Sequence, residues 1–200
     1  SGLLPMERLT ATKVMVVGVG AIGRQVALQL AAMGVTYMEL VDFDTVEESN
    51  IASQGYWEED FRRYKTDATA DLCRRINAEM DVQAVSDRFR RSMEVHDALF
   101  VAVDSIQIRG LVWQAVKDRV AFFCDGRMAA EALRVLTAAD GPSRKHYPTT
   151  LFAAEEAHRG ACTAKSTIYT ANIAAGLMVA QFARFLRGMP VDADLQLNIL

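Results

Sequence analysis

The hydrophobic positions of this chain alternate between short apolar runs and longer segments with helical spacing. The first run, KVMVVG at residues 13–18, is typical of a buried β-strand, and apolar residues then recur every three or four positions as far as Gly34. The other predicted strands are residues 36–42, 82–87, 98–104, 120–126 and 132–138, and the other predicted helices are residues 64–79, 106–119 and 166–188. This alternation predicts an α/β protein with a Rossmann-like, mostly parallel central sheet covered by helices.

Finer features of the pattern give three further expectations. In the helix predicted at residues 64–79, Leu72 and Ile76 lie on one apolar face. The polar stretch EESNIASQG, residues 47–55, is predicted to be a loop. A second polar stretch, residues 141–150, is predicted to be a loop or a crossover connection.

Composition narrows the classes of partner. The 200 residues are 51% hydrophobic, and 25 acidic against 22 basic side chains give a net charge of −3. Nucleic acid and membrane partners are not expected, because there is no basic excess and no apolar run of membrane-spanning length. We expect a cytoplasmic protein with one domain over residues 1–200. Since the sequence stops on the strand-like LQLNIL, the alternative that this domain is part of a longer chain stays open.

The three cysteines, Cys73, Cys124 and Cys162, are far apart in the sequence and odd in number. This disfavours a disulfide framework, and the absence of any CxxC pair disfavours structural zinc. Cys73 lies within a predicted helix and Cys124 ends a predicted strand, so both are expected to be structural. We therefore predict free thiols and no zinc site.

A glycine-rich turn carries the first candidate chemistry. Gly18, Gly20 and Gly23 form GxGxxG immediately after a predicted strand and at the start of a predicted helix. Glycines there let backbone amides approach a phosphate, and Asp42 at the end of the next strand is placed to accept bonds from ribose hydroxyls. The pattern indicates a nucleotide, either ATP or a nicotinamide or flavin dinucleotide. A glycine turn needed only for packing is the alternative.

Several spaced motifs resemble the ThiF/MoeB and ubiquitin-activating-enzyme family. They are GxGAIG, LVDFDTVEESN, Gln54, the pair Lys65-Thr66 that opens a helix, and VAVDS. The resemblance covers residues 13–104 and continues more weakly to residue 180. It implies a ThiF-like adenylation domain that uses ATP and Mg²⁺ to adenylate the C-terminal carboxylate of a small ubiquitin-like or sulfur-carrier protein.

The resemblance also implies roles for individual residues. Asp42 would bind ribose, Lys65 would bind phosphate and Asp104 would bind magnesium, whereas Asp44, Asn50 and Gln54 would complete the nucleotide site. Each role has a structural alternative: Asp104 and Ser105 at a helix N-cap, a solvated Lys65, and turn-closing amides at Asn50 and Gln54.

One position departs from the family pattern. The arginine that precedes the glutamine in the family motif is replaced by Ser53, which removes a guanidinium from the phosphate site. Arg62 or Arg63, just ahead of Lys65, are candidate replacements. Arg8 and Arg24 are further candidates, and Arg127 is a candidate contact for a phosphate or an acidic tail.

The run CTAKSTIYTANIAAGLMVAQF resembles the Cys-Thr pair that carries the thioester in ubiquitin-like activating enzymes. This resemblance implies that Cys162 is a nucleophile at the start of the last helix, where a helix dipole favours the thiolate. A small residue packed near a helix start is the alternative. The family also implies a homodimer.

Two other functions are left open by the sequence. An NAD-dependent oxidoreductase is supported by the glycine turn and Asp42 alone. A non-catalytic scaffold half of a heterodimeric activating enzyme is supported by the serine at position 53.

Overall fold

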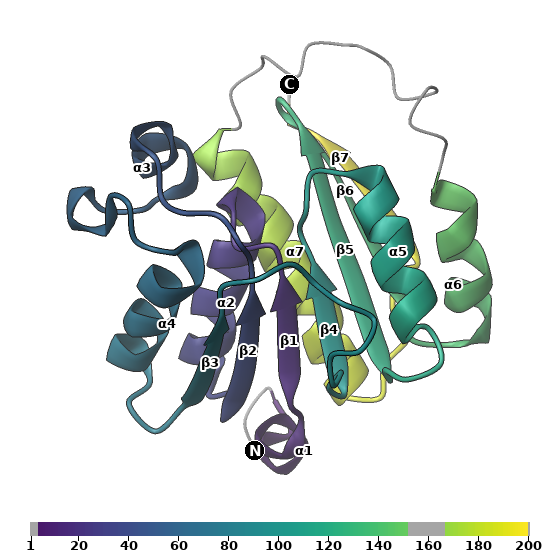
Figure 1. The fold of residues 1–200 in the computed structure, drawn as a ribbon. Coiled ribbons are helices and arrows are strands. Elements are labelled where there is room, and N and C mark those ends of the chain that lie inside the picture. Colours follow the sequence, from purple (N-terminus) through teal and green to yellow (C-terminus); the bar gives the residue numbers. More distant parts are fainter. Residues whose placement is uncertain (1–3, 152–166, 200) are drawn as a thin grey trace.

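The computed structural model describes residues 4–151 and 167–199. In these ranges the chain alternates strands and helices, as Figure 1 shows. The strands are β1 (Val14–Val17), β2 (Tyr37–Val41), β3 (Asp81–Val85), β4 (Ala98–Val101), β5 (Phe122–Ala129), β6 (Ala132–Ala138) and β7 (Asp194–Asn198). The helices are α1 (Met6–Ala11), α2 (Ala21–Met33), α3 (Glu48–Gln54), α4 (Lys65–Ile76), α5 (Ile106–Val116), α6 (Gly141–His146) and α7 (Ile168–Leu186), with short 3₁₀ turns η1 (Glu58–Asp60) and η2 (Tyr147–Thr150).

The strands described form one sheet in the order β3-β2-β1-β4-β5-β6-β7. The first five in this order are parallel, whereas β6 and β7 are antiparallel to their neighbours. The predicted mostly parallel, helix-covered sheet is confirmed. The strand order reverses between β1 and β4, and in open α/β sheets ligands bind at such a reversal, beyond the carboxyl ends of the strands.

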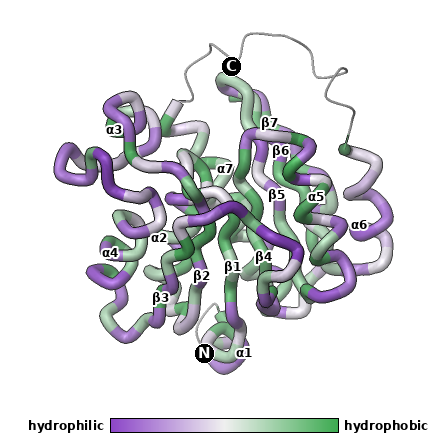
Figure 2. Tube along the Cα trace, in the orientation of Figure 1, coloured by the Kyte–Doolittle hydropathy of each residue, from purple (hydrophilic) through white to green (hydrophobic). Residues whose placement is uncertain are grey.

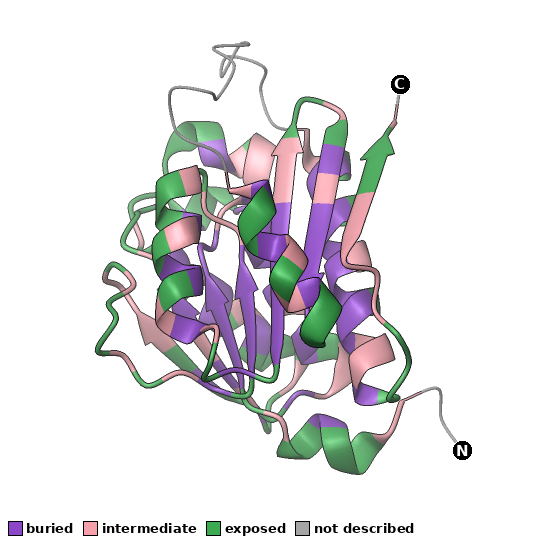
Figure 3. Ribbon diagram, turned by 90° about the vertical axis from the view of Figure 1, so that its right-hand side faces the viewer, coloured by how far each residue is buried: buried purple, intermediate pink, exposed green. Residues whose placement is uncertain are grey.

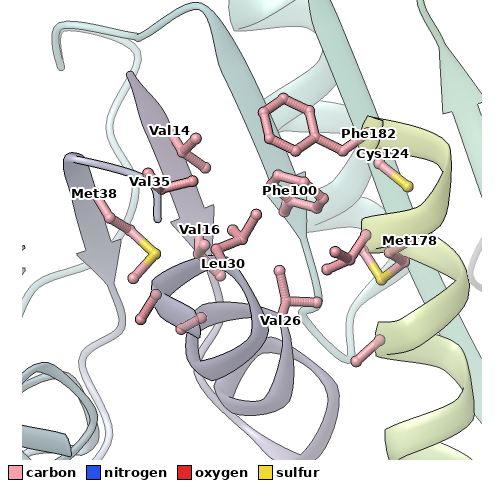
Figure 4. Packing of buried hydrophobic residues seen from close by; sticks show 14 of the residues in the cluster. Val14, Val16, Val26, Leu30, Val35, Met38, Phe100, Cys124, Met178 and Phe182 are labelled. Carbon is pink, nitrogen blue, oxygen red and sulfur yellow. The ribbon is translucent and has the colours of Figure 1, made fainter. Parts of the chain in front are cut away.

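Two apolar layers cover the sheet because side chains along each strand point alternately to opposite faces. Val14 and Val16 of β1 pack in the layer that contains α2 and α7, whereas Met15 and Val17 pack in the layer that contains α5. Figure 4 shows the first layer, with Phe182 of α7 beside the sheet. The central strands are accordingly the most hydrophobic part of the chain in Figure 2 and are buried in Figure 3.

Helix α2 ends at Gly34, as the sequence predicts. This glycine has a φ of 98° in the left-handed region, and its N–H bonds back to the last turn of the helix. Strand β2 begins a few residues later, so β1, α2 and β2 form a βαβ crossover. The glycine-rich turn is the connection between β1 and α2.

Three expectations were wrong. The stretch 47–55 is not a loop, because it contains helix α3. Glu47 is the N-cap of this helix, and Asn50 Oδ1 accepts the N–H of Glu47 in a capping box. The stretch 141–150 is helical as well, with Asp140 as the cap of α6 followed by η2. In α4, Ile76 is exposed and Leu72 is only partly buried, so the predicted Leu72–Ile76 face is not the buried face of this helix.

The α4 face that packs on the sheet is instead built from small and polar side chains, namely Lys65, Thr66, Ala68, Thr69, Ala70 and Cys73. Within the described residues, no helix has the length and hydropathy to cross a bilayer.

Candidate functional site

A cavity of about 680 Å³ lies beyond the carboxyl ends of the parallel strands. Its wall combines the turn after β1, the ends of β2 and β4, the first turn of α5 and the outer half of β5. The polar and charged residues that line it are Asp42, Asp44, Gln54, Lys65, Asp87, Arg88, Asp104, Ser105, Arg109 and Arg127. This is the place where the strand order reverses, and the volume is that of a small-molecule site.

The three glycines of the turn have different physical roles. Gly18 has a φ of 87°, and a Cβ on it would lie 2.7 Å from the carbonyl oxygen of Ala102. A Cβ on Gly23 would overlap the carbonyl oxygen of Gly18, so this glycine is required for the packing of helix on strand. Gly20 faces the cavity, and the heavy atom nearest to an added Cβ would be Gln54 Oε1 at 3.7 Å. Gly18 and Gly20 both line the cavity, but of the three glycines only Gly20 has room for a Cβ.

Asp42 fixes this turn from the end of β2. Its two carboxylate oxygens accept the backbone N–H groups of Val19 at 2.6 Å and Asp44 at 2.9 Å. Burial raises the pKa of Asp42, and these backbone bonds oppose that shift. The carboxylate keeps further lone pairs toward the cavity that it lines.

Lys65, the first residue of α4, is largely buried with its ammonium 3.5 Å from the carboxylate of Asp44. Gln54, the last residue of α3, lines the same cavity. Its Oε1 is buried and accepts no hydrogen bond from any described residue. A buried acceptor without a partner is where a bound molecule would supply a donor.

Three other predicted residues do not line the cavity. Asn50 Oδ1 accepts the N–H of Glu47 at 3.0 Å and so closes the first turn of α3. The guanidinium of Arg63 pairs with Asp60 and Asp71, whereas Arg62 lies over the ring of Phe61. The structure thus places Asn50 in the first turn of α3, and Arg62 and Arg63 in the connection between α3 and α4.

The more distant arginine candidates are also engaged elsewhere. Arg24 is buried, stacks 4.1 Å from the ring centroid of Tyr56 and donates to the carbonyl of Gly55. Arg8 lies 5.9 Å over the ring of Phe185. Neither of these two arginines lines the cavity of this chain.

Asp104 follows β4 and is exposed in the cavity wall. The cap of α5 is Ser105, whose Oγ accepts the N–H of Ile108 at 3.3 Å, so Asp104 itself is not the cap. It forms no ion pair with a described residue. In the described ranges no three His, Cys, Asp or Glu side chains gather as a metal site. One free carboxylate fits magnesium that takes its other ligands from phosphate and water.

Sequence reasoning missed a buried ion cluster at the same wall. Asp125 of β5 is fully buried, pairs with Arg109 and Arg127, and accepts the hydroxyl of Tyr147 at 2.9 Å. Burial lowers the pKa of Arg109 to about 10, and the charge of Arg127 adds to this shift. Of this cluster, the sequence singles out only Arg127 as a candidate ligand contact. Asp125, the partner of Arg109, lies 16 residues further along the chain in β5, and no local sequence pattern links the two.

A second missed pair lies at the opposite side of the cavity. The guanidinium of Arg88 is 4.5 Å from the ring centroid of Phe43, and both side chains line the cavity. Phe43 is half exposed, which makes its ring available for stacking.

The described cysteines have the structural places that the sequence predicts. Cys73 and Cys124 are buried free thiols, and burial raises the pKa of each to about 12. They are unsuited to nucleophilic chemistry. Cys162 lies outside the described residues.

Comparison with known families gives a match to the ThiF family over residues 2–198. The chain belongs to the ThiF family. The resemblance drawn from its motifs is therefore confirmed. One curated relative, "Adenylyltransferase and sulfurtransferase MOCS3-1" of Zea mays, is 31% identical over 117 residues, which cover 56% of this chain and 25% of that protein.

A second relative, "SAMP-activating enzyme E1" of Haloferax volcanii, is 34% identical over 93 residues, which cover 46% of this chain and 34% of that protein. The matches thus span a quarter to a third of these ThiF-family relatives.

Solved structures confirm the fold. The E. coli MccB structure has a TM-score of 0.79 at 17% identity and covers 96% of this chain and 60% of that one. PaaA has a TM-score of 0.77 at 20% identity, over 96% of this chain and 62% of that one. E. coli MccB has also been crystallised with ATP, in a structure that matches with a TM-score of 0.74 at 16% identity.

Proposed function

We propose that this ThiF-family chain is an ATP- and magnesium-dependent adenylyltransferase that activates the C-terminal carboxylate of a small ubiquitin-like or sulfur-carrier protein. The observation that carries the proposal is the convergence of Gly20, Asp42, Gln54, Lys65 and Asp104 on one cavity. The relatives named for adenylyl transfer and for SAMP activation support the same reaction class.

The reaction needs cations more than it needs a base. A carboxylate oxygen forms a bond to the α-phosphorus while the bond to pyrophosphate breaks, and the leaving pyrophosphate takes the electron pair. The nucleophile is already ionised, so no proton has to be removed. Because two anions meet, Lys65 would neutralise phosphate charge, and magnesium held at Asp104 would lower the charge of the leaving group.

Each remaining side chain would orient the nucleotide. Asp42 accepts ribose hydroxyls from a position fixed by the N–H of Val19, and the free Oε1 of Gln54 accepts a further donor. Phe43 offers its exposed ring to the base. The ammonium of Lys65 lies 3.5 Å from the carboxylate of Asp44, and a phosphate would compete with this carboxylate for it.

ATP–pyrophosphate exchange tests the proposal. With a small protein that ends in Gly-Gly as acceptor, exchange should appear and should fall about a hundredfold or more in Lys65→Ala and Asp104→Ala. Lys145→Ala and Asp118→Ala, both exposed and outside the cavity wall, are the matched controls. Stabilisation by NADH instead of ATP and magnesium in a thermal-shift assay would favour an oxidoreductase and sink the proposal.

The thioester step is a separate proposal. Cys162 would attack the acyl adenylate, form the thioester and release AMP. Cys162→Ala should keep exchange and lose an acceptor adduct that is sensitive to reductant. An adduct that persists in this variant would show that another residue carries the thioester.

We also propose that the protein forms a homodimer, and light scattering would measure its oligomeric state.

A further inference from the structure

At the outer end of β5, two guanidinium groups share one carboxylate. Asp125 is fully buried and is the only carboxylate among the described residues that pairs with Arg109 and Arg127. Tyr147 donates its hydroxyl to the same carboxylate, and burial raises the pKa of Tyr147, so this phenol stays neutral. The two guanidinium charges of this cluster therefore exceed its one carboxylate charge, and Asp104 is a further carboxylate whose charge acts on Arg109.

The two arginines differ in how far their donors are used. In Arg127, Nε donates to Asp125 at 2.9 Å, whereas Nη1 and Nη2 donate to the carbonyl and hydroxyl of Thr150 at 2.9 and 3.2 Å. In Arg109, Nη1 alone is used: it donates to the carbonyl of Gly126 at 3.1 Å and contacts Asp125. Within the described residues, nothing accepts a bond from Nε or Nη2 of Arg109.

The unused donors of Arg109 lie on one edge of its guanidinium plane. A planar edge with Nε–H and Nη2–H side by side is the geometry that binds a carboxylate or a phosphate through two parallel bonds. The side chain is 7% exposed and lines the cavity, so this edge is held in place before any ligand binds. Arg109 also lies in the first turns of α5, just beyond Asp104 and at the same wall.

We propose that Arg109 binds an oxyanion of the reactants in this cavity and that Asp125 is the positioning residue that aims it. The oxyanion is either a phosphate of the nucleotide or the carboxylate of the acceptor, both of which present paired oxygens. This inference rests on the proposed adenylation. It assigns a guanidinium to the site of a chain that has serine at position 53.

Binding measurements on Arg109→Gln test the inference. The probes are adenosine, ATP with magnesium, and a short synthetic peptide that ends in Gly-Gly with a free carboxylate, added with AMP. Adenosine affinity should be unchanged, whereas the affinity for ATP or for the peptide should fall about tenfold or more. A loss for ATP identifies a phosphate, and a loss for the peptide alone identifies the carboxylate. Arg187→Gln, an exposed arginine outside the cavity wall, is the matched control.

Equal affinities of Arg109→Gln and the wild type for both oxyanion probes would overturn the inference, as would an equal loss for adenosine. If the wild type binds adenosine but gains nothing from phosphates or carboxylate, the inference fails while a nucleoside site remains. Failure of wild-type exchange with intact ATP binding would instead count against the proposed function.

Asp125→Asn tests the positioning role. It should weaken the same probe as Arg109→Gln, and it should add no further loss in the double variant, because it acts through Arg109. If Asp125→Asn weakens binding by the same factor in the Arg109→Gln background as in the wild type, Asp125 acts only through the fold. Arg109→Lys keeps the charge without the planar edge, so it should restore only part of the affinity.

Discussion

The hydroxyl of Tyr56 donates a hydrogen bond to the carbonyl oxygen of Val19 at 2.5 Å. The N–H of the same Val19 donates to Asp42. Both backbone polar groups of the residue between Gly18 and Gly20 are thus held by side chains from other elements. The glycine-rich turn is rigid for this reason, and a rigid turn loses little entropy when it binds phosphate.

Tyr56→Phe should lower the free energy of unfolding by about 1–2 kcal/mol, because it leaves the buried Val19 carbonyl without its partner. ATP affinity should fall as well, since the turn gains freedom. Urea denaturation and calorimetric titration measure the two effects. Tyr64→Phe, at an exposed tyrosine, should change neither quantity. Unchanged stability in Tyr56→Phe would contradict the constraint.

Alkaline pH provides a second test of the same side chain. Burial raises the pKa of Tyr56 above its ordinary value of 10.0. The neutral phenol is therefore favoured in the folded state, so its contribution to stability is present below about pH 10 and is lost as pH rises further. The wild type should lose more unfolding free energy than Tyr56→Phe between about pH 9 and 11. Parallel curves for the two proteins would refute the assignment.

Gly20 and Gly23 should respond to alanine in opposite ways. Gly23→Ala should lower stability by about 2 kcal/mol or more, because its Cβ overlaps the carbonyl of Gly18. Gly20→Ala has room for a Cβ and an ordinary φ of −79°, so it should fold normally and bind ATP about tenfold more weakly. Thermal denaturation and ATP titration separate the effects. Normal ATP binding by Gly20→Ala would mean that phosphate does not approach this turn.

The buried thiols should be chemically silent in the native protein. Burial raises the pKa of Cys73 and of Cys124 to about 12, so both thiols stay protonated at pH 8. Peptide mapping after iodoacetamide treatment should find both unmodified until urea is added. In Cys162→Ser, native labelling should then be absent altogether. Rapid labelling of Cys73 or Cys124 in the folded protein would show that the apolar layer containing both residues opens.

The long elements of the fold could be predicted from the sequence because their periodicity extends over many residues. The short helix α3 could not, since Ile51 is its single strongly apolar residue and no period can be seen. Helix α6 did carry start signals, Asp140 as cap and a proline in the first turn, but its six residues are too few for a hydrophobic pattern.

The candidate site divides in the same way. The glycine turn and Asp42 form a local motif whose spacing along the chain predicts that they meet, whereas Lys65 is predicted from the resemblance to the ThiF/MoeB family. Arg109 is one polar position in an amphipathic helix, and its burial follows from Asp125 of a later strand. Such a pairing depends on how two distant segments pack, which periodicity does not encode.

Strand β5 pairs with β4 only as far as Asp125, so its last four residues, 126–129, project past the end of β4 and are braced by β6. In this stretch Arg127 faces the α5 layer, whereas Gly126 faces Met178 of α7. A single residue inserted before Arg127 would exchange the two faces of the sheet for every side chain after it, so Arg127 would point away from the α5 layer. Evolution can therefore lengthen this strand only in steps of two without losing a cation from the wall.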